Sequence, residues 1–448
     1  MKTKKGLQVV LRLAVLVFCL ALLIKSATVY AIDTNPCLSE SSRKPITSAD
    51  FFNHDIALLR EQGVQADLVL VGASRVYRSY IPQEIEDGLN LDVVINGGTS
   101  AQPTFSSCCM LYQLIDMFHP KYAVVGLTWG SFIDEPLVNG VLIAGDFMTR
   151  YMKVINAEMQ LSANDLQLLD DNIRYSANAD KEDDIKAQRK ALVESEYSNT
   201  ELTKGDYYKD TGFVLSTASQ EQGNIEMGGK RTWKASRVID SNLMALDAIC
   251  NLCDKNEVKL YFVVTPTSMM RTYGLIGYDE ADAYMNKYAR DHNAVFFDLN
   301  LMRDREKKLP DSLMRDNNHV NGEGAKIVSQ CLVDCIRADL EGKDASAYLY
   351  DSVEELKADC NRVVAVKADI AINGNSAKVS IDSMQNKAID PLYRVLIATS
   401  DSDYKVIKDW THDAECIISV PSGSSFTIKV VAAKSAEDKE PAWMTYSF

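Results

Sequence analysis

The chain has 448 residues, of which 46% are hydrophobic and 25% charged. That length allows two or three domains, and the composition is typical of a folded globular protein, which excludes a disordered or fibrous chain. The formal net charge of −14 repels phosphate backbones. We therefore expect a multidomain protein that does not bind nucleic acid.

Residues 1–31 have the charge and hydropathy pattern of an export segment. Several lysines precede an apolar run from Leu13 to Leu23, and the small residues Val29 and Ala31 fit a cleavage site. The run is shorter than the ~20 residues of a membrane-spanning helix, although the flanking residues Gly6 to Val10 extend it. The pattern therefore predicts either a cleaved signal peptide or an N-terminal membrane anchor. In both cases the rest of the chain lies outside the cytoplasm, secreted or anchored to the cytoplasmic membrane.

The ten cysteines lack the density of a disulfide framework in a chain this long. Cys250 and Cys253 lie in one helical pattern, and Cys331 and Cys335 in another. No second pair of ligands is spaced to complete a tetrahedral zinc site. We therefore expect buried thiols and no metal site. The sequence does not decide whether disulfides form after export.

Short apolar runs alternate with helical patterns in two stretches of the chain, on either side of residues 134–235. The runs are typical of buried parallel strands, and several end in glycine-rich turns. This alternation predicts an α/β domain over residues 32–345 whose mainly parallel sheet is covered on both faces. The predicted strands are 66–72, 91–95, 122–127, 258–265 and 294–299, and the predicted helices are 109–118, 236–256, 279–292 and 322–340.

Residues 134–235 interrupt this alternation and predict an insertion. Charged helical patterns over 151–195 are followed by a stretch rich in Ser, Thr, Gly and Tyr over 196–232. The insertion either covers the active site or elaborates the surface, and the sequence does not decide between the two.

Residues 361–448 have a different character from the rest of the chain. Evenly spaced short runs are separated by turn residues such as Asn373-Gly374-Asn375, which predicts a small antiparallel β-sandwich. Such a module binds glycans, acts as a spacer or packs against the main domain. The predicted strands are 363–372, 377–381, 392–399, 416–420 and 426–432.

Three segments carry residues suited to nucleophilic catalysis. Ser74 follows the first predicted strand, and Asn96-Gly97-Gly98 follows the second, where a backbone N–H can face an oxyanion. Asp316 and His319 share a turn before the last helix, which Asn321 is placed to cap. A serine needs a base, and an imidazole needs a carboxylate to orient it. Each segment taken alone also fits an ordinary turn.

The order of these segments resembles the SGNH/GDSL hydrolase superfamily. The N-terminal apolar segment and the form Gly72-Ala73-Ser74-Arg75 resemble its membrane-anchored branch, which includes DltD-like and alginate O-acetylation-like proteins. The resemblance covers residues 64–133 and 236–340. It implies a flavodoxin-like, three-layer parallel sheet, and it implies action on acyl groups of cell-envelope polymers.

The resemblance also implies a role for each residue of the site. Ser74 is then the nucleophile, His319 the base and Asp316 the carboxylate that orients it. The backbone N–H groups of Ser74 and Gly98 form part of the oxyanion hole.

The family's asparagine after the third strand is absent, since this stretch reads Gly126-Leu127-Thr128-Trp129-Gly130. Either Thr128 or Asn96 is then the replacement donor. Arg75 and Arg78, just after the serine, are candidates to bind an anionic substrate.

These observations predict a serine esterase or O-acyltransferase that moves an acyl group, such as acetyl, to or from a cell-envelope polysaccharide. The proposed chemistry requires no cofactor. The alternative is a non-catalytic or accessory envelope protein that binds glycans or a membrane-embedded acyltransferase.

Overall fold

The computed structural model describes residues 48–100, 102–134, 201–219, 232–399, 403–423, 425–439 and 441–448. The predicted export segment at 1–31 and the charged helices predicted at 151–195 lie outside the described residues. None of the helices within the described ranges combines the length and apolar character needed to cross a membrane.

A five-stranded parallel sheet forms the centre of the α/β domain, with strand order β2-β1-β3-β7-β8. This order is flavodoxin-like: the chain moves from β1 outward to β2 and then returns past β1 to β3. The prediction of an α/β domain with a mainly parallel sheet is therefore confirmed. The strands are β1 (Leu68–Val71), β2 (Val94–Asn96), β3 (Tyr122–Leu127), β7 (Lys259–Val264) and β8 (Val295–Asp298).

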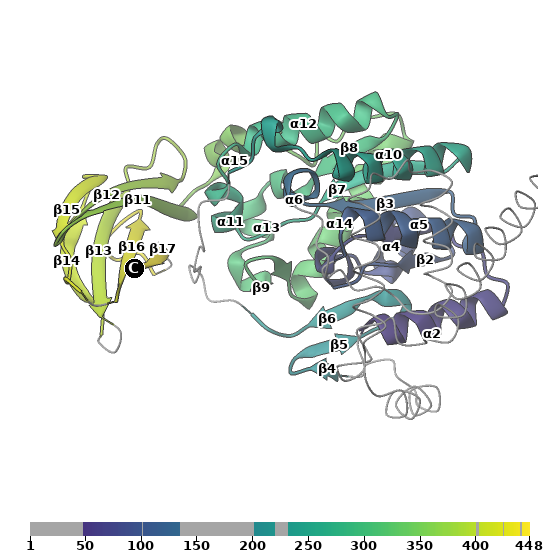
Figure 1. Ribbon diagram of the computed structural model, residues 1–448, viewed down its shortest axis with the longest axis horizontal. Helices are drawn as coiled ribbons and strands as arrows, with labels where there is room; N and C mark the ends of the chain where they lie inside the picture. Colours follow the sequence, from purple (N-terminus) through teal and green to yellow (C-terminus); the bar gives the residue numbers. More distant parts are fainter. Residues whose placement is uncertain are drawn as a thin grey trace, which may run out of the picture.

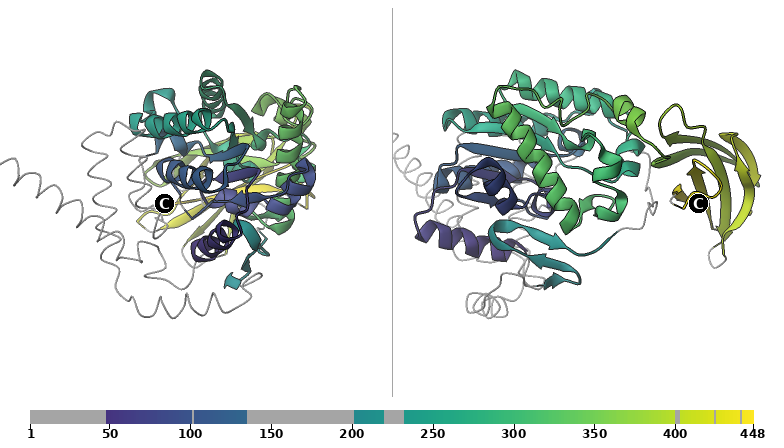
Figure 2. Two further views of the ribbon diagram at one scale, coloured as in Figure 1. Left: turned by 90° about the vertical axis from the view of Figure 1, so that its right-hand side faces the viewer. Right: turned by 180° about the vertical axis from the view of Figure 1, so that it is seen from behind.

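Helices cover both faces of this sheet (Figures 1 and 2). Successive side chains of a strand point to opposite faces, so Val69 and Val71 pack on one side while Leu68 and Leu70 pack on the other. The first side is covered by α5 (Thr104–Phe118), α10 (Asp240–Lys255) and α12 (Tyr278–Asp291); the second is covered by α3 (Ser74–Ser79), α4 (Pro82–Leu89) and α14 (Gly322–Leu340).

Helix α14 begins directly after Asn321, the residue that the sequence predicts as its cap. The Asn321 side-chain Oδ1 accepts a hydrogen bond from the Gly324 N–H at 3.1 Å, which satisfies one of the donors that the first turn leaves without an intrahelical partner. The shorter elements of the domain are α2 (Ser48–Glu61), α6 (Gly130–Ile133), α11 (Met269–Gly274), α13 (Arg305–Lys308), β9 (Met314–Asp316), β10 (His319–Val320) and α15 (Val353–Asp359).

The described part of the insertion, residues 201–219, is a small antiparallel sheet of order β4-β5-β6 that lies to the left of α2 in Figure 1. The helices predicted in the insertion lie at 151–195, outside the described residues, so this sheet does not test them. Gly205, with φ of +81°, makes the tight turn between the first two strands, and β-favouring side chains such as Tyr207 and Tyr208 follow it. The strands are β4 (Glu201–Thr203), β5 (Asp206–Tyr208) and β6 (Val214–Ser216).

The C-terminal residues form two antiparallel sheets to one side of the α/β domain (Figure 1), of order β11-β12-β15 and β14-β13-β16-β17. The edge strands β14 and β17 have no counterpart among the predicted runs, and the exposed residues of β14 show no apolar alternation. The strands are β11 (Ala365–Asn373), β12 (Ser376–Met384), β13 (Leu392–Thr399), β14 (Lys405–Thr411), β15 (Glu415–Ser419), β16 (Phe426–Ala433) and β17 (Ala442–Ser447).

The insertion is packed against the main sheet through Gly212. This residue has φ of +97°, and a Cβ added to it would lie 1.9 Å from the carbonyl oxygen of Asn96, at the end of β2. We expect Gly212→Ala to lower the free energy of unfolding by about 3 kcal/mol, because the backbone conformation and the contact are both unfavourable. Gly63→Ala is the control: its φ is +67° but its Cβ meets nothing within 4 Å. Urea denaturation that ranks the two variants equally would contradict the close contact.

Candidate active site

Ser74 is the first residue of α3 and follows β1 directly, so its side chain lies at the carboxyl end of the parallel sheet. Three glycines allow α3 to approach the strand ends closely. A Cβ on Gly72 would lie 2.6 Å from Val76 Cγ2, one on Gly126 would lie 2.2 Å from the same atom, and one on Gly98 would lie 3.0 Å from Val76 Cβ. Any larger residue at these positions would displace the helix that carries Ser74.

The structure brings Ser74, His319 and Asp316 together. Ser74 Oγ lies 2.8 Å from His319 Nε2, and His319 Nδ1 lies 2.8 Å from Asp316 Oδ1 and 2.9 Å from Oδ2. Asp316 and His319 face each other across β9 and β10. The backbone N–H groups of Asn318 and His319 also donate to Asp316 Oδ1, at 2.8 and 3.1 Å. The carboxylate is thus held in one orientation toward the imidazole.

The environment keeps this aspartate charged and this histidine neutral. Burial raises the pKa of Asp316, but hydrogen bonds from His319, the Asn318 N–H and Arg315 outweigh it, so the pKa lies well below its usual range. Burial lowers the pKa of His319, and the attraction of Asp316 offsets this effect only in part. With Nδ1–H donating to Asp316, the neutral imidazole presents Nε2 as an acceptor to the Ser74 hydroxyl.

Asp206, in β5 of the insertion, is a buried member of the site that the sequence patterns do not reveal. It is 2% exposed and accepts hydrogen bonds from Arg78 Nη2 at 2.8 Å and from Arg315 Nη2 and Nε at 3.0 and 3.1 Å. Arg315 Nη1 in turn donates to Asp316 Oδ2 at 2.8 Å. Burial raises the pKa of Asp206, but the two arginines lower it by more, and the net shift is strongly downward. The insertion therefore supplies a carboxylate that is linked to His319 through Arg315 and Asp316.

The two arginines predicted to bind substrate both contact protein groups. Arg78 pairs with Asp206, as described above. Arg75 is 8% exposed, donates to Asn318 Oδ1 at 3.1 Å and lies 5.9 Å from the centre of the Trp129 ring. Both side chains lie beside the Ser74–His319 pair, and their role in binding an anion stays a prediction.

Two of the predicted oxyanion donors are engaged inside the protein. Asn96 is fully buried, and its Nδ2 donates to the carbonyl oxygens of Val76 and Tyr80 at 3.1 and 2.9 Å. Its Oδ1 accepts the Gly98 N–H at 3.1 Å. In this structure these groups hold the turn after β2 against α3, and their role as oxyanion donors stays a prediction. The Ser74 N–H begins a helix and has no intrahelical acceptor.

The segment after β3 forms a turn in which Thr128 contacts Ser131. The Thr128 N–H donates to Ser131 Oγ at 2.9 Å, and the Thr128 and Ser131 hydroxyls lie 3.4 Å apart.

Gln102 Oε1 accepts the Gly72 N–H at 2.7 Å, and its Nε2 donates to the backbone oxygen of Gly97 at 3.4 Å. Gln102 thus connects the turns after β1 and β2, a role that no sequence pattern indicates.

No group of three or more His, Cys, Asp and Glu side chains in the described part of the chain is placed to hold a metal ion. The cysteines of these residues are free thiols, and all except Cys416 are buried. Burial raises the pKa of the Cys250 thiol to about 12. Such thiols are protonated at neutral pH and are poor nucleophiles.

Neither a protein-family model nor a curated protein sequence matches the chain. Among solved structures, it is similar to a GDSL-like lipase from Bacteroides thetaiotaomicron, with 10% identity and a TM-score of 0.31, over 66% of this chain and 98% of that one. It is also similar to a putative acylhydrolase from Bacteroides fragilis, with 10% identity and a TM-score of 0.31, over 64% of this chain and 95% of that one. Function is accordingly inferred from the geometry of the site.

Replacing Asp206 tests whether its contacts with Arg78 and Arg315 stabilise the protein. We expect Asp206→Asn to lower the free energy of unfolding by about 3–5 kcal/mol, because Arg78 and Arg315 lose the carboxylate that compensates their charges. Glu341→Gln is the control, since the Glu341–Lys343 pair is exposed to solvent and its loss is expected to change the stability little. Equal stability of the two variants in urea denaturation would show that Asp206 is not needed in the fold.

Proposed function

We propose that the protein is a serine esterase or O-acyltransferase that works through an acyl-Ser74 intermediate. The observation that supports this most directly is the continuous set of hydrogen bonds from Ser74 Oγ through His319 to Asp316, each close to 2.8 Å. A nucleophile, a neutral base and a charged orienting group in this order constitute the machinery of acyl transfer.

In the first step Ser74 Oγ attacks the carbonyl carbon of an ester, and His319 Nε2 takes the hydroxyl proton. The Ser74 N–H is a donor placed to stabilise the resulting oxyanion. The tetrahedral intermediate then expels the alcohol, which receives the proton from His319, and the acyl group stays on Ser74. Asp316 remains ionised throughout and stabilises the imidazolium.

In the second step a hydroxyl group attacks the acyl-Ser74 carbonyl and gives its proton to His319. The intermediate collapses, and Ser74 leaves with that proton restored to its Oγ. Water as the acceptor gives hydrolysis, and a sugar hydroxyl gives transfer, with identical roles for the three residues.

The proposed substrate is a cell-envelope polysaccharide carrying acyl groups such as acetyl. The export pattern of residues 1–31 supports this location, as does the resemblance of the Gly72-Ala73-Ser74-Arg75 segment to the DltD-like branch. A membrane-embedded acyltransferase is the proposed partner if the N-terminal segment is retained as an anchor.

A second candidate function is a non-catalytic envelope protein that binds glycans. It is favoured by one observation, that the N–H of Gly98 and the amide of Asn96 are engaged within the protein, which leaves fewer donors for an oxyanion.

A fluorophosphonate probe, which reacts with activated serines, separates the two candidates. We expect the full chain to be labelled and Ser74→Ala to remain unlabelled, because His319 activates only the hydroxyl that it contacts. Ser100→Ala, a nearby exposed serine, is the control and is expected to be labelled like the wild type. Absence of labelling in all three proteins would favour the glycan-binding candidate.

The pH dependence of ester hydrolysis tests His319 as the base. His319 accepts a proton only when neutral, so activity is present above its pKa and is lost as the pH falls through it. Burial lowers this pKa below the usual ~6.5. We therefore expect kcat/KM for p-nitrophenyl acetate to be constant from pH 8 to pH 7 and half-maximal below about pH 6.5. His412→Ala, at an exposed position, is expected to leave the profile unchanged; a midpoint above pH 7 would contradict the assignment.

A further inference from the structure

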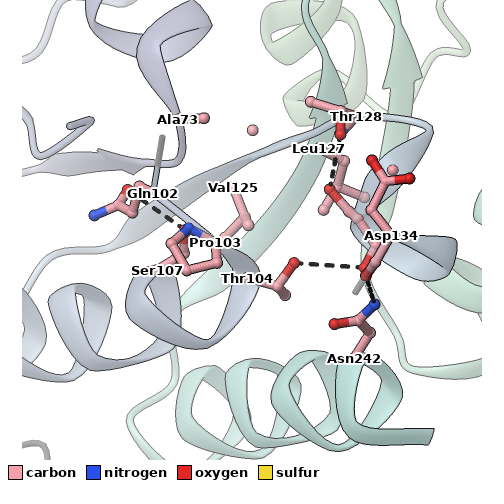
Figure 3. Close-up of a pocket in the computed structure, with 13 residues that line it drawn as sticks. Ala73, Gln102, Pro103, Thr104, Ser107, Val125, Leu127, Thr128, Asp134 and Asn242 are labelled. Atoms are coloured by element: carbon pink, nitrogen blue, oxygen red, sulfur yellow. Dashed lines mark hydrogen bonds between the residues drawn. The ribbon is translucent and has the colours of Figure 1, made fainter. Parts of the chain in front are cut away.

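A pocket of about 160 Å³ opens beside Ala73, the residue before Ser74, at the carboxyl end of the sheet (Figure 3). Its walls come from the ends of β1 and β3, the start of α5, the short helix α6 and the first turn of α10. Ala73, the residue bonded to Ser74, forms part of the lining, together with Thr104 and Thr128. None of the three residues proposed to carry out the chemistry lines this pocket, so its role is separate from theirs.

The pocket adjoins the segment that carries Ser74. Ala73 and Ser74 are consecutive, so their Cα atoms are about 3.8 Å apart. The strands β1 and β3 are neighbours, with Val71 paired to Val125, so both strands end at the same edge of the sheet. Val125 and Leu127 line the pocket from that edge. The pocket therefore lies on the β3 side of the residue that precedes Ser74.

The size of the pocket limits what it holds. An apolar cavity of about 150 Å³ in another protein accommodates benzene, which has six carbon atoms. A volume of 160 Å³ therefore accepts an acyl group of about two to six carbons. A fatty acyl chain of ten or more carbons does not fit.

Several polar side chains in the walls bond to protein groups, which leaves the surface beside them suited to an alkyl group. Ser107 Oγ donates to Gln102 Oε1 at 3.4 Å, and Asn242 Nδ2 donates to the backbone carbonyl oxygen of Asp134 at 2.9 Å. Thr104 Oγ1 is directed to the Ser131 oxygen at 3.5 Å. A short alkyl group enters such a pocket without leaving a buried donor or acceptor without its bond.

We propose that this pocket binds the acyl group of the substrate and restricts it to short chains, from acetyl to about hexanoyl. The inference rests on the proposed function for its chemistry, but the pocket's ability to bind a short acyl group does not depend on Ser74 being reactive.

Binding is tested first, in the absence of chemistry. Butyramide, a neutral analogue of a butyryl ester, is titrated into the full chain and into Ser74→Ala, with saturation-transfer NMR as the readout. We expect both to bind it with similar affinity. Thr104 is half-buried at the start of α5, so Thr104→Phe fills the pocket with little disturbance of the core and is expected to weaken binding at least ~10-fold.

Thr104→Val is the matched control, because it removes the hydroxyl and keeps the shape; we expect binding within about twofold of the wild type. Equal butyramide binding by Thr104→Phe and the wild type would overturn the proposal, and so would no binding by either Ser74 form.

Turnover is tested second, with p-nitrophenyl butyrate and p-nitrophenyl decanoate. We expect kcat/KM to favour the butyrate at least ~10-fold in the wild type, since several methylenes of the longer chain lie outside the pocket. Equal kcat/KM for the two esters would overturn the restriction to short chains. If neither ester is hydrolysed while Ser74→Ala still binds butyramide and Thr104→Phe does not, the pocket assignment stands and the proposed esterase function fails.

Discussion

The close approach of α3 to the ends of three parallel strands is the constraint on which the geometry of the site depends. Val76 lies against Gly72, Gly98 and Gly126, and a Cβ at any of the three would meet it or its backbone neighbour at 3.0 Å or less. This packing fixes the start of the helix, and the start of the helix carries Ser74. Asn96 adds to the constraint by donating to two carbonyl oxygens of the same segment. The hydroxyl is therefore placed by buried backbone contacts, which vary little in a folded protein.

Contacts between oppositely charged side chains hold His319 and Asp316, the partners of the Ser74 hydroxyl. His319 lies near Arg75 and Arg78, whose charges oppose protonation of the imidazole, while Asp316 favours it. Asp206 compensates Arg78 and Arg315, and Arg315 at the same time contacts Asp316. Alternating acidic and basic side chains thus extend from the insertion to the imidazole. Because the members are buried or half-buried, salt screens these contacts less than it screens exposed pairs.

Much of the fold follows from local sequence patterns. Each predicted strand of the central sheet corresponds to an observed one, and the helix predicted at 322–340 has the same limits in the structure. Apolar runs and caps report on contacts within a few residues, so they locate elements well. Local patterns do not predict the edge strands β14 and β17, because their environment is set by pairing with β13 and β16, respectively. The short spacing of Asp316 and His319 likewise marks them in the sequence, and the structure places Ser74 beside them.

The residues that the sequence does not reveal act across long separations. Asp206 is 128 residues from Arg78 and 109 from Arg315, and no local pattern distinguishes it from other acidic residues of the insertion. Gly98 and Asn96 show the converse case, because their motif suggests donors that face a ligand. In the fold the Gly98 N–H donates to Asn96 Oδ1, and Asn96 Nδ2 donates to two backbone carbonyl oxygens. Tertiary packing decides which polar groups form hydrogen bonds inside the protein and which remain able to contact a ligand.

The contacts of Asp206 also bear on how this chain can change over evolution. Segments inserted between the elements of an α/β fold are usually gained and lost with little consequence, because they touch the core only at its surface. Here a chain that lost the insertion would leave Arg78 without its carboxylate partner and Arg315 with Asp316 alone. Relatives that lack the insertion should therefore have a neutral residue at the position of Arg78. Relatives that retain both arginines should preserve a carboxylate at the position of Asp206, so the three sites are expected to covary as a unit.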